Sequence, residues 1–359
     1  MSNDNTKQDQ VNVDHLQEID AKSSRREFLA IGAAAAVAGF AGFKGGTSTR
    51  KGQLPQSALT FPGSKPNVAV VKAESYSHDL EGRMREGIRA CGLDVRGKSV
   101  LLKPNFVEFD PNTCINTDVA VVATALEVFR SLGAAQVRIG EGPGHRRDTY
   151  AMAELTRYRT EIPNFDSVFV DLIRDNESKV QIFADRPEFY FPNSVLGADL
   201  IVSLAKMKTH HWAGATLSMK NYFGLVPGSI YGWPKNELHY IGIPKAIVEL
   251  TRQFGQKSFA IVDGIVGMEG NGPIQGTPKK VGVMVMGSNL PAVDATCCRI
   301  MGLDPGRIGY LEMTAGKNNL REELIPQIGE RVSTVATRFA LLPELEYLRL
   351  AGSVNRTGA

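Results

Sequence analysis

The sequence predicts an α/β protein with a largely parallel, doubly wound sheet and helices on both of its faces. Strand and helix patterns alternate along most of the chain, which is typical of parallel strands joined by helical crossovers. Runs such as DLIVSLA at residues 199–205 are apolar, of strand length and rich in β-branched residues, as buried strands are. No repeat with a period of roughly 20–50 residues is present, so the sequence excludes a repeat array.

Glycine and proline delimit the elements of the first half. One helix is expected to end at Gly92 and the next at Gly133, because glycine readily adopts the left-handed conformation that closes a helix. Pro104 ends a strand, since it has no N–H to donate to the ladder. The expected strands are 67–74, 98–107 and one within 135–144 that ends in a glycine turn, and the expected helices are 78–93, 117–134 and 148–162.

The second half continues the alternation and then changes character. The segment 330–350 is predicted to be a helical C-terminal appendage that Pro343 interrupts. We therefore expect an α/β domain over residues 67–325 and a helical C-terminal extension over 326–359. In the second half of the α/β domain the expected strands are 167–173, 199–205, 258–265 and 279–288, with a ribbon at 179–183 and 188–192. The expected helices there are 243–255 and 290–303.

The N-terminus resembles a twin-arginine (Tat) export signal. Arg25 and Arg26 precede an Ala- and Gly-rich apolar run. That run, residues 28–43, is shorter than the roughly 20 residues that span a bilayer. Ala36-Val37-Ala38 fits a cleavage site, and retention as an uncleaved anchor stays open. We expect a Tat signal region at 1–46, a linker at 47–66, the Tat machinery as a partner, and a periplasmic or other extracytoplasmic location.

Composition narrows the classes of function. The net charge of +3 and the 22% of charged residues are ordinary, and no basic run or motif argues for nucleic acid. Outside the signal, no apolar stretch is long enough for an integral membrane domain. The four cysteines form no C-x-x-C pair, which excludes a ferredoxin cluster or zinc ribbon. Cys297 and Cys298 are expected to be buried free thiols in a helix, and a Cys91–Cys114 bridge stays open.

Residues 206–240 carry the most distinctive chemistry of the chain. They include both tryptophans and three of the six histidines, and they follow the predicted strand 199–205. Such side chains just past a strand are typical of the ligand crevice of an α/β protein. The alternative is a solvated loop held by its aromatic residues; we favour a functional site. Its basic residues are Lys206, Lys208, His210, His211, Lys220, Lys235 and His239.

Polar residues also follow other predicted strands. A parallel sheet brings the carboxyl ends of its strands to one edge, so these residues are expected to converge around one cavity. Lysines and glycine turns favour a carboxylate or phosphate. No nucleotide-binding or G-x-S-x-G motif is present, and no ligand spacing supports a metal site built from His210, His239, Asp263 and Glu269. The strand-end residues are Lys103 and Asn105, then Glu141, then Lys206, Lys208 and His210, and last Asp263, Glu269 and Asn271.

A series of motifs gives the chain a family resemblance. KPNF, GEGPG, LAKMKTHHWAGATLSMKNYFGLVPG, DGIVGMEGNGP and PAVDATCCRIMGL, from about Val68 to Gly302, resemble successive motifs of domain-of-unknown-function family 362. Many members carry an appended iron–sulfur segment, which this chain lacks because it has no suitable cysteine series. The polar positions that the resemblance implies are Lys103, Asn105, Glu141, Lys206, Lys208, His210, Lys220, Asn221, His239, Glu269 and Asn271.

Two classes of function follow. The first is an exported enzyme acting on a small anionic molecule, with catalytic residues His210, His239, Lys208 and Glu269. In this hypothesis His210 or His239 moves a proton, and Glu269 or Glu141 orients that histidine or acts as the partner base. The second is a non-catalytic ligand-binding or redox-partner module that uses the same crevice. Neither assigns a metal ligand, and the cofactor is left unknown. Because strand-exit residues contribute little to a core, Lys208, His210 and Lys220 are expected to affect ligand capture rather than folding. The expected ligand-binding residues are Lys103, Asn105, Glu141, Lys206, Lys220, Asn221 and Asn271.

Overall fold

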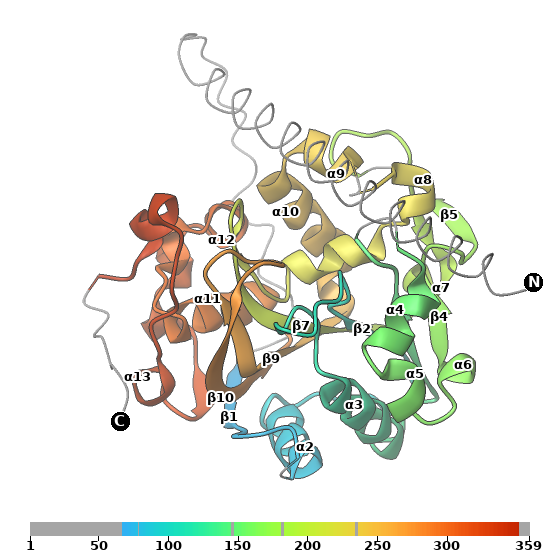
Figure 1. Cartoon of the computed structure of the whole chain (residues 1–359), viewed down its shortest axis with the longest axis horizontal. Helices are drawn as coiled ribbons and strands as arrows, with labels where there is room; N and C mark the ends of the chain where they lie inside the picture. The colour runs from blue at the N-terminus through green and yellow to red at the C-terminus, as the bar shows by residue number, and fades with distance from the viewer. Residues whose placement is uncertain (1–66, 78, 145–146, 181–182, 234–235, 352–359) are drawn as a thin grey trace, which may run out of the picture. The chain divides into compact units, whose positions relative to one another are not determined.

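The computed structural model describes residues 67–77, 79–144, 147–180, 183–233 and 236–351 (Figure 1). The predicted Tat signal region (1–46), the linker (47–66) and Lys235 lie outside the described residues.

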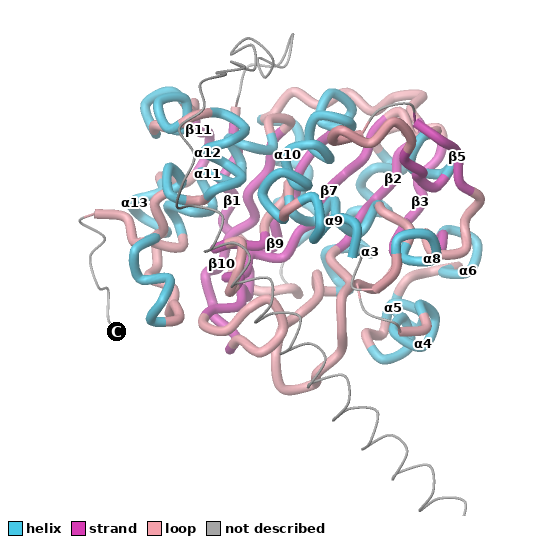
Figure 2. Tube along the Cα trace, turned by 90° about the horizontal axis from the view of Figure 1, so that it is seen from above, coloured by secondary structure: helices cyan, strands magenta, loops and turns pink. Residues whose placement is uncertain are grey.

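A nine-stranded sheet forms the centre of the fold. The strands β9, β7, β2, β3 and β4 are hydrogen-bonded in this order and run parallel. On the other side of β9, strand β10 is antiparallel to both β9 and β1, and β11 pairs with β1 in parallel. Figure 2 shows the same order, from β11 to β3. The predicted largely parallel sheet is confirmed. The bounds are β1 Val68–Lys72, β2 Ser99–Pro104, β3 Gln136–Glu141, β4 Phe169–Asp171, β7 Leu200–His210, β8 Gly214–Thr216, β9 Ser258–Glu269, β10 Thr277–Gly287 and β11 Gln327–Gly329, with a separate ribbon of β5 Glu177–Val180 and β6 Phe189–Pro192.

Helices cover both faces of the sheet, as predicted (Figure 1). Successive strand residues alternate between two apolar cores: Val100 and Leu102 pack with α2 and α3 on one face, and Leu101 packs on the opposite face, where α10 and α11 lie. The first face carries α2 Leu80–Ala90, α3 Val119–Ser131, α4 Thr149–Leu155, α5 Tyr158–Glu161 and α6 Phe165–Val168, and the second α10 Ile243–Phe254, α11 Leu290–Ile300 and α12 Gly309–Ala315. The shorter elements are α7 Asn193–Leu196, α8 Gly228–Tyr231, α9 Asn236–Ile241, α13 Val332–Val335, η1 Lys220–Leu225, η2 Gly255–Lys257, η3 Pro305–Arg307, η4 Lys317–Leu320, η5 Glu322–Leu324 and η6 Pro343–Leu348.

Two elements differ in detail from the sequence prediction. The helix expected over 148–162 is divided into α4 and α5, because Arg157 adopts a left-handed backbone conformation with φ 65°. Up to residue 351, where the described part of the chain ends, the helices of the C-terminal segment are the short α13 and η6, and the segment also supplies β11 to the sheet. The expected domain boundary after residue 325 stays a prediction.

The strand predicted over 199–205 is longer than expected, and this changes the setting of the site. β7 runs to His210, so Lys206, Lys208 and His210 belong to a strand and not to the loop after it. The extension is stabilised from both sides. β9 is opposite Lys206 and Lys208, and β8 is opposite Lys208 and His210.

Candidate functional site

Three basic side chains in the second half of β7 are buried. Lys206, Lys208 and His210 alternate along the strand, so their side chains leave the same face of the sheet. Their exposed fractions are 1%, 0% and 4%. Lysine is almost never fully buried unless it is paired, so the partners of each side chain decide its role.

Lys206 has a carboxylate partner. Its Nζ lies 2.8 Å from Oδ2 of Asp263 on the neighbouring strand β9, and it donates to the hydroxyl of Tyr76 over 2.9 Å. The Tyr76 hydroxyl in turn donates to Oδ1 of Asp263 over 3.1 Å. Burial, followed by the negative charge of Asp263, raises the pKa of Tyr76. Within this group the positive charge of Lys206 is balanced by Asp263.

Lys103, at the end of β2, also has a carboxylate partner. Its Nζ forms a fully buried ion pair with Glu141 at the end of β3, and it donates to the carbonyl of Pro104 over 2.7 Å. Burial lowers the pKa of Lys103, and the charge of Glu141 opposes that shift. Gly224 of η1 covers the pair. A Cβ on Gly224 would lie 2.3 Å from the Lys103 Nζ, so only glycine fits there without displacement.

Lys208 differs, because neutral oxygens surround it. Its Nζ donates to Oδ1 of Asn105 and the carbonyl of Ile115, both over 2.8 Å, and to the carbonyl of Pro273 over 3.2 Å. These three acceptors match the three N–H groups of an ammonium ion. No carboxylate pairs with Lys208 in the described part of the chain. Burial, followed by the positive charges of Lys220 and Lys206, lowers its pKa well below the ordinary value.

A buried hydrogen-bond chain connects Lys208 to the opposite face of the sheet. Asn105 donates to Asn221 over 3.3 Å, and Asn221 donates to Ser203 over 3.1 Å. The hydroxyl of Ser203 donates to the carbonyl of Ser218. Asp294 of α11 accepts hydrogen bonds from the N–H of Ser218 and of the next residue, and burial raises its pKa to about 7. Asp294 therefore fixes the segment that leads directly into Lys220.

Lys220 is the first residue of η1, and its positive charge contributes to the lowered pKa of Lys208. Its Nζ is 4.3 Å from the centroid of the Phe223 ring. Among the described residues, no hydrogen-bond acceptor or carboxylate pairs with it. The side chain is partly exposed, and burial lowers its pKa to about 8. Its charge also contributes to lowering the pKa values of Lys208, His210 and His211.

The hydrogen bonds of His210 fix its tautomer. Its Nδ1 accepts the backbone N–H groups of Trp212 and Ala213 over 3.0 and 3.2 Å. A nitrogen that accepts two hydrogen bonds carries no proton, so the proton of the neutral ring is assigned to Nε2. Burial and the neighbouring positive charges lower the pKa of His210, which keeps the ring neutral. His210 therefore offers an Nε2–H hydrogen-bond donor, and its predicted catalytic role stays a prediction.

His211 has the complementary arrangement. Its Nδ1 lies 2.8 Å from the carbonyl oxygen of Gly272, which can only accept, so Nδ1 carries the proton and Nε2 is left as the acceptor. Burial lowers the pKa of His211. The rings of His210 and His211 have centroids 4.9 Å apart. A donor and an acceptor imidazole thus lie side by side.

Three predicted site residues have other surroundings. His239 of α9 contacts the ring edges of Trp212 and Phe223, with centroids 6.2 and 6.3 Å away. Glu269, at the end of β9, accepts the N–H of Ala340 over 2.8 Å and lies 3.4 Å from Lys279. Asn271 donates to Gln275 over 3.0 Å. Glu269 and Asn271 therefore stabilise the loop and the C-terminal segment, and in the described structure neither forms a hydrogen bond or ion pair with Lys206, Lys208 or Lys220.

The expected convergence of strand ends is partly confirmed. Lys103 and Glu141 lie at the carboxyl ends of β2 and β3, and Lys206 lies in the second half of β7, which is the next parallel strand. A common cavity around them stays a prediction. The described residues contain no group of three or more His, Cys, Asp and Glu side chains that could hold a metal ion, so the set of His210, His239, Asp263 and Glu269 is not assembled. All four cysteines are free, and the Cys91–Cys114 bridge is not formed.

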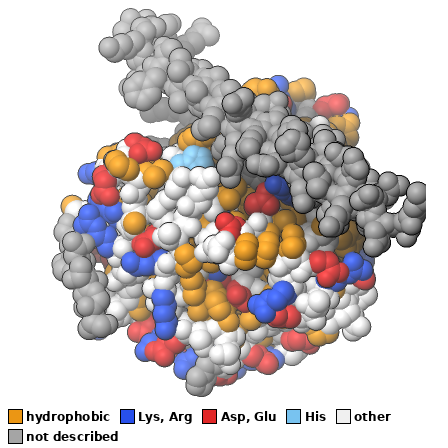
Figure 3. Space-filling model, in the orientation of Figure 1, with side chains coloured by type: hydrophobic (Ala, Val, Ile, Leu, Met, Phe, Trp, Pro, Cys, Tyr) orange, Lys and Arg blue, Asp and Glu red, His pale blue; other side chains and the backbone are white. Residues whose placement is uncertain are grey.

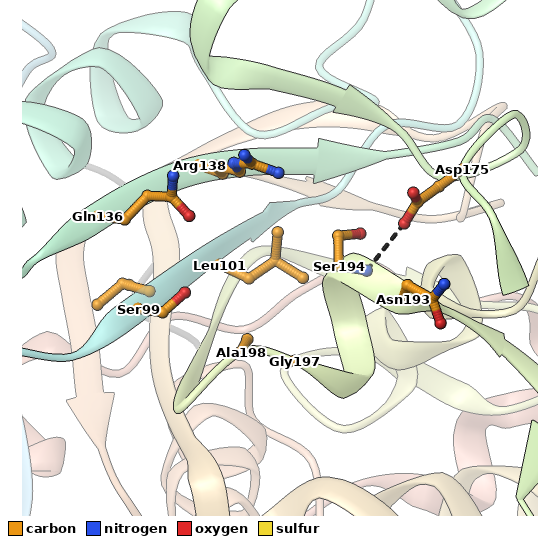
Figure 4. A pocket seen from close by; sticks show the side chains of 10 residues that line it. Ser99, Leu101, Gln136, Arg138, Asp175, Asn193, Ser194, Gly197 and Ala198 are labelled. Carbon is orange, nitrogen blue, oxygen red and sulfur yellow. Dashed lines mark hydrogen bonds between the residues drawn. The ribbon is translucent and has the colours of Figure 1, made fainter. Parts of the chain in front are cut away.

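A separate pocket of about 310 Å³ lies at the opposite, amino end of β2 and β3 (Figure 4). Ser99, Gln136 and Arg138 line it, and the N–H of Ser194 donates to Asp175 at its edge over 2.9 Å.

In the view of Figure 3, acidic and basic side chains are interspersed near the rim of the molecule, with hydrophobic side chains nearer to the middle. No helix in the described ranges has the length and apolar character needed to cross a bilayer.

Comparison with known proteins identifies the family. Residues 100–299 match the model of a family described as Domain of unknown function (DUF362). The chain belongs to this family. The match includes β2, β3, β7, β9 and α11, and with them every lysine and histidine of the site. The resemblance noted in the sequence is thereby confirmed.

Two individual proteins are similar to this chain. A thylakoid-associated protein of Synechocystis sp. is 27% identical over 253 residues, which are 67% of this chain and 76% of that protein. A structure of the lactate racemase apoprotein from Thermoanaerobacterium thermosaccharolyticum matches with a TM-score of 0.43 and 13% identity. That match covers 66% of this chain and 56% of the racemase chain.

Proposed function

We propose that this family member is an exported enzyme that binds a small anionic molecule beside Lys208 and Lys220. One observation carries the proposal: these two neighbouring lysines have no carboxylate partner in the described structure, whereas Lys103 and Lys206 each have one. Uncompensated positive charges in a desolvated position are costly, and a bound anion offsets that cost. A carboxylate or phosphate matches the charge of both lysines and the N–H donors of Lys220.

The two histidines support catalysis over simple binding. A binding module would present splayed lysines on a shallow basic face, but Lys208 is fully buried and held by three oxygens. His210 offers an Nε2–H that can stabilise negative charge developing on the substrate. His211 offers an unprotonated Nε2 that can accept a proton. Together they provide the donor and the base that a proton transfer on a bound anion requires.

Anion binding is tested by calorimetric titration with inorganic phosphate and with acetate. Wild type is expected to bind at least one of them, and Lys220→Met is expected to bind it about tenfold to a hundredfold more weakly. Lys317→Met is the matched control. Lys317 is an exposed lysine at the start of η4, and its Nζ lies 3.3 Å from Glu312 of α12. Equal affinity in wild type and Lys220→Met would end the proposal.

Export is tested separately at the predicted signal. Changing Arg25 and Arg26 together to Lys is expected to leave the protein in the cytoplasm, because Tat recognition depends on the arginine pair. Cell fractionation measures the outcome. A double variant found in the periplasm at the wild-type level would contradict Tat export.

A further inference from the structure

We propose that Lys220 is a nucleophile that forms an iminium bond with the carbonyl carbon of a 2-oxo acid. The inference rests on the proposed function, because it places the carboxylate of the 2-oxo acid in the anion site. It adds a covalent step and a substrate class.

The surroundings of Lys220 single it out among the site lysines. Three hydrogen bonds hold Lys208, and carboxylates hold Lys103 and Lys206. Lys220 has an aromatic ring on one side and other basic groups around it, and no acceptor fixes its Nζ in the described part of the chain. A lysine that is desolvated or lies next to another cation is activated as a nucleophile, because its neutral amine form is favoured. Burial lowers its pKa to about 8, in agreement with this geometry.

The neighbouring groups supply what the step needs. The Lys220 ammonium gives a proton to Nε2 of His211, and the free amine attacks the carbonyl carbon of the 2-oxo acid. The Nε2–H of His210 stabilises the negative charge that develops on the carbonyl oxygen. The carbonyl oxygen then leaves as water. The ammonium and the carbonyl compound thus give a protonated iminium and one water molecule, and no oxidant or reductant is consumed.

Lys208 is suited to attract the carboxylate by its charge and not to react. Its three N–H groups point to the oxygens of Asn105, Ile115 and Pro273, so its amine cannot reach a carbonyl carbon without breaking that arrangement. It acts instead as a fixed positive charge beside Lys220. Lys208 therefore attracts the anion, and Lys220 forms the bond.

Borohydride trapping tests the inference on the intact protein. Wild type is incubated at neutral pH with glyoxylate or 2-oxoglutarate, reduced with sodium cyanoborohydride and analysed by peptide mass mapping. The expected adduct adds the mass of the oxo acid less one oxygen atom, on Lys220. The lowered pKa gives Lys220 a free-amine fraction roughly a hundredfold above that of an ordinary lysine, so we expect labelling at least about tenfold above any exposed lysine.

Two variants and one binding measurement separate the outcomes. Lys220→Arg keeps the charge and is expected to lose the adduct, whereas Lys317→Met is expected to keep it. Phosphate or acetate binding without an adduct on Lys220 would overturn the inference and leave the proposed function intact. An adduct spread over the exposed lysines at equal yield would also overturn it. If wild type binds neither phosphate nor acetate, both the inference and the proposed function are wrong. Because mapping of wild type locates the adduct directly, the test does not depend on whether a variant folds.

Discussion

Two pairs of lysines from the same edge of the sheet show how similar residues acquire different roles. Lys103 and Lys206 are buried against Glu141 and Asp263. Lys208 and Lys220 lie within the same region and have only neutral oxygens or an aromatic ring beside them in the described structure. The first pair is electrically balanced by the fold. The second pair leaves positive charge that the fold does not balance, which is the property expected of an anion site.

The largest expected effect is on the balanced pair. Glu141→Gln keeps the shape of the side chain but leaves the Lys103 ammonium buried without a countercharge. We expect the free energy of unfolding to fall by about 3–5 kcal/mol, because an uncompensated buried charge is strongly destabilising. Urea denaturation measures it, and Asp263→Asn is expected to behave similarly. A loss below about 1 kcal/mol would contradict the idea that this pair is structural.

Lys208→Met is expected to have an intermediate effect on stability. The change removes a buried positive charge, but it leaves the oxygens of Asn105, Ile115 and Pro273 without a donor. Each buried polar atom that loses its partner costs about 1–3 kcal/mol, partly offset by the loss of the charge. We expect a net loss of about 1–3 kcal/mol in the free energy of unfolding, together with weaker phosphate binding. An unchanged urea midpoint would show that the three hydrogen bonds do not contribute to the free energy of unfolding.

Lys220→Met is expected to leave the free energy of unfolding at pH 7 at least as large as in wild type, because the side chain makes no hydrogen bond in the described structure and burial lowers its pKa, so its charge does not favour folding. The loss is expected in phosphate affinity. A combination of large destabilisation and normal affinity would reverse the comparison and make Lys220 a structural residue.

A pH dependence of stability is expected to distinguish Lys220 from the balanced lysines. Its pKa is lowered from an ordinary 10.5 to about 8 in the folded protein. Between these values the unfolded chain binds the proton and the folded chain does not, so the free energy of unfolding rises with pH across that window. The Lys220→Met variant is expected to lose this rise. Urea midpoints of both proteins from pH 7 to pH 10, in steps, measure the difference.

The comparison also shows what the sequence could predict. The α/β class, the strand order along the chain and the gathering of Lys103, Glu141 and Lys206 at strand ends followed from hydrophobic patterns and strand polarity. The length of β7 did not, since polar residues at alternate positions look like a loop when the neighbouring strands are unknown. The expectation that Lys208 and His210 would matter little for folding was wrong in its premise, because both are buried.

Three further residues needed the structure. The roles of His210 and His211 depend on which ring nitrogen contacts the backbone, which no spacing in the sequence reveals. His211 was visible in the HH pair but not assigned to the site. Asp294 lies in a recognised motif, yet its contact with the segment before Lys220 joins positions far apart in the chain.

The position of β1 has a consequence for the order of folding. This first described strand lies between β10 and β11, which come from the last third of the chain, and Ala69 is opposite Met286. During synthesis β1 therefore has no partner until almost the whole domain has emerged, and such long-range pairing is slow. The predicted export signal lies just upstream of this late-docking strand. For a transport route that accepts folded cargo, the attachment of β1 to the finished sheet would report at the N-terminus that the C-terminal strands are in place.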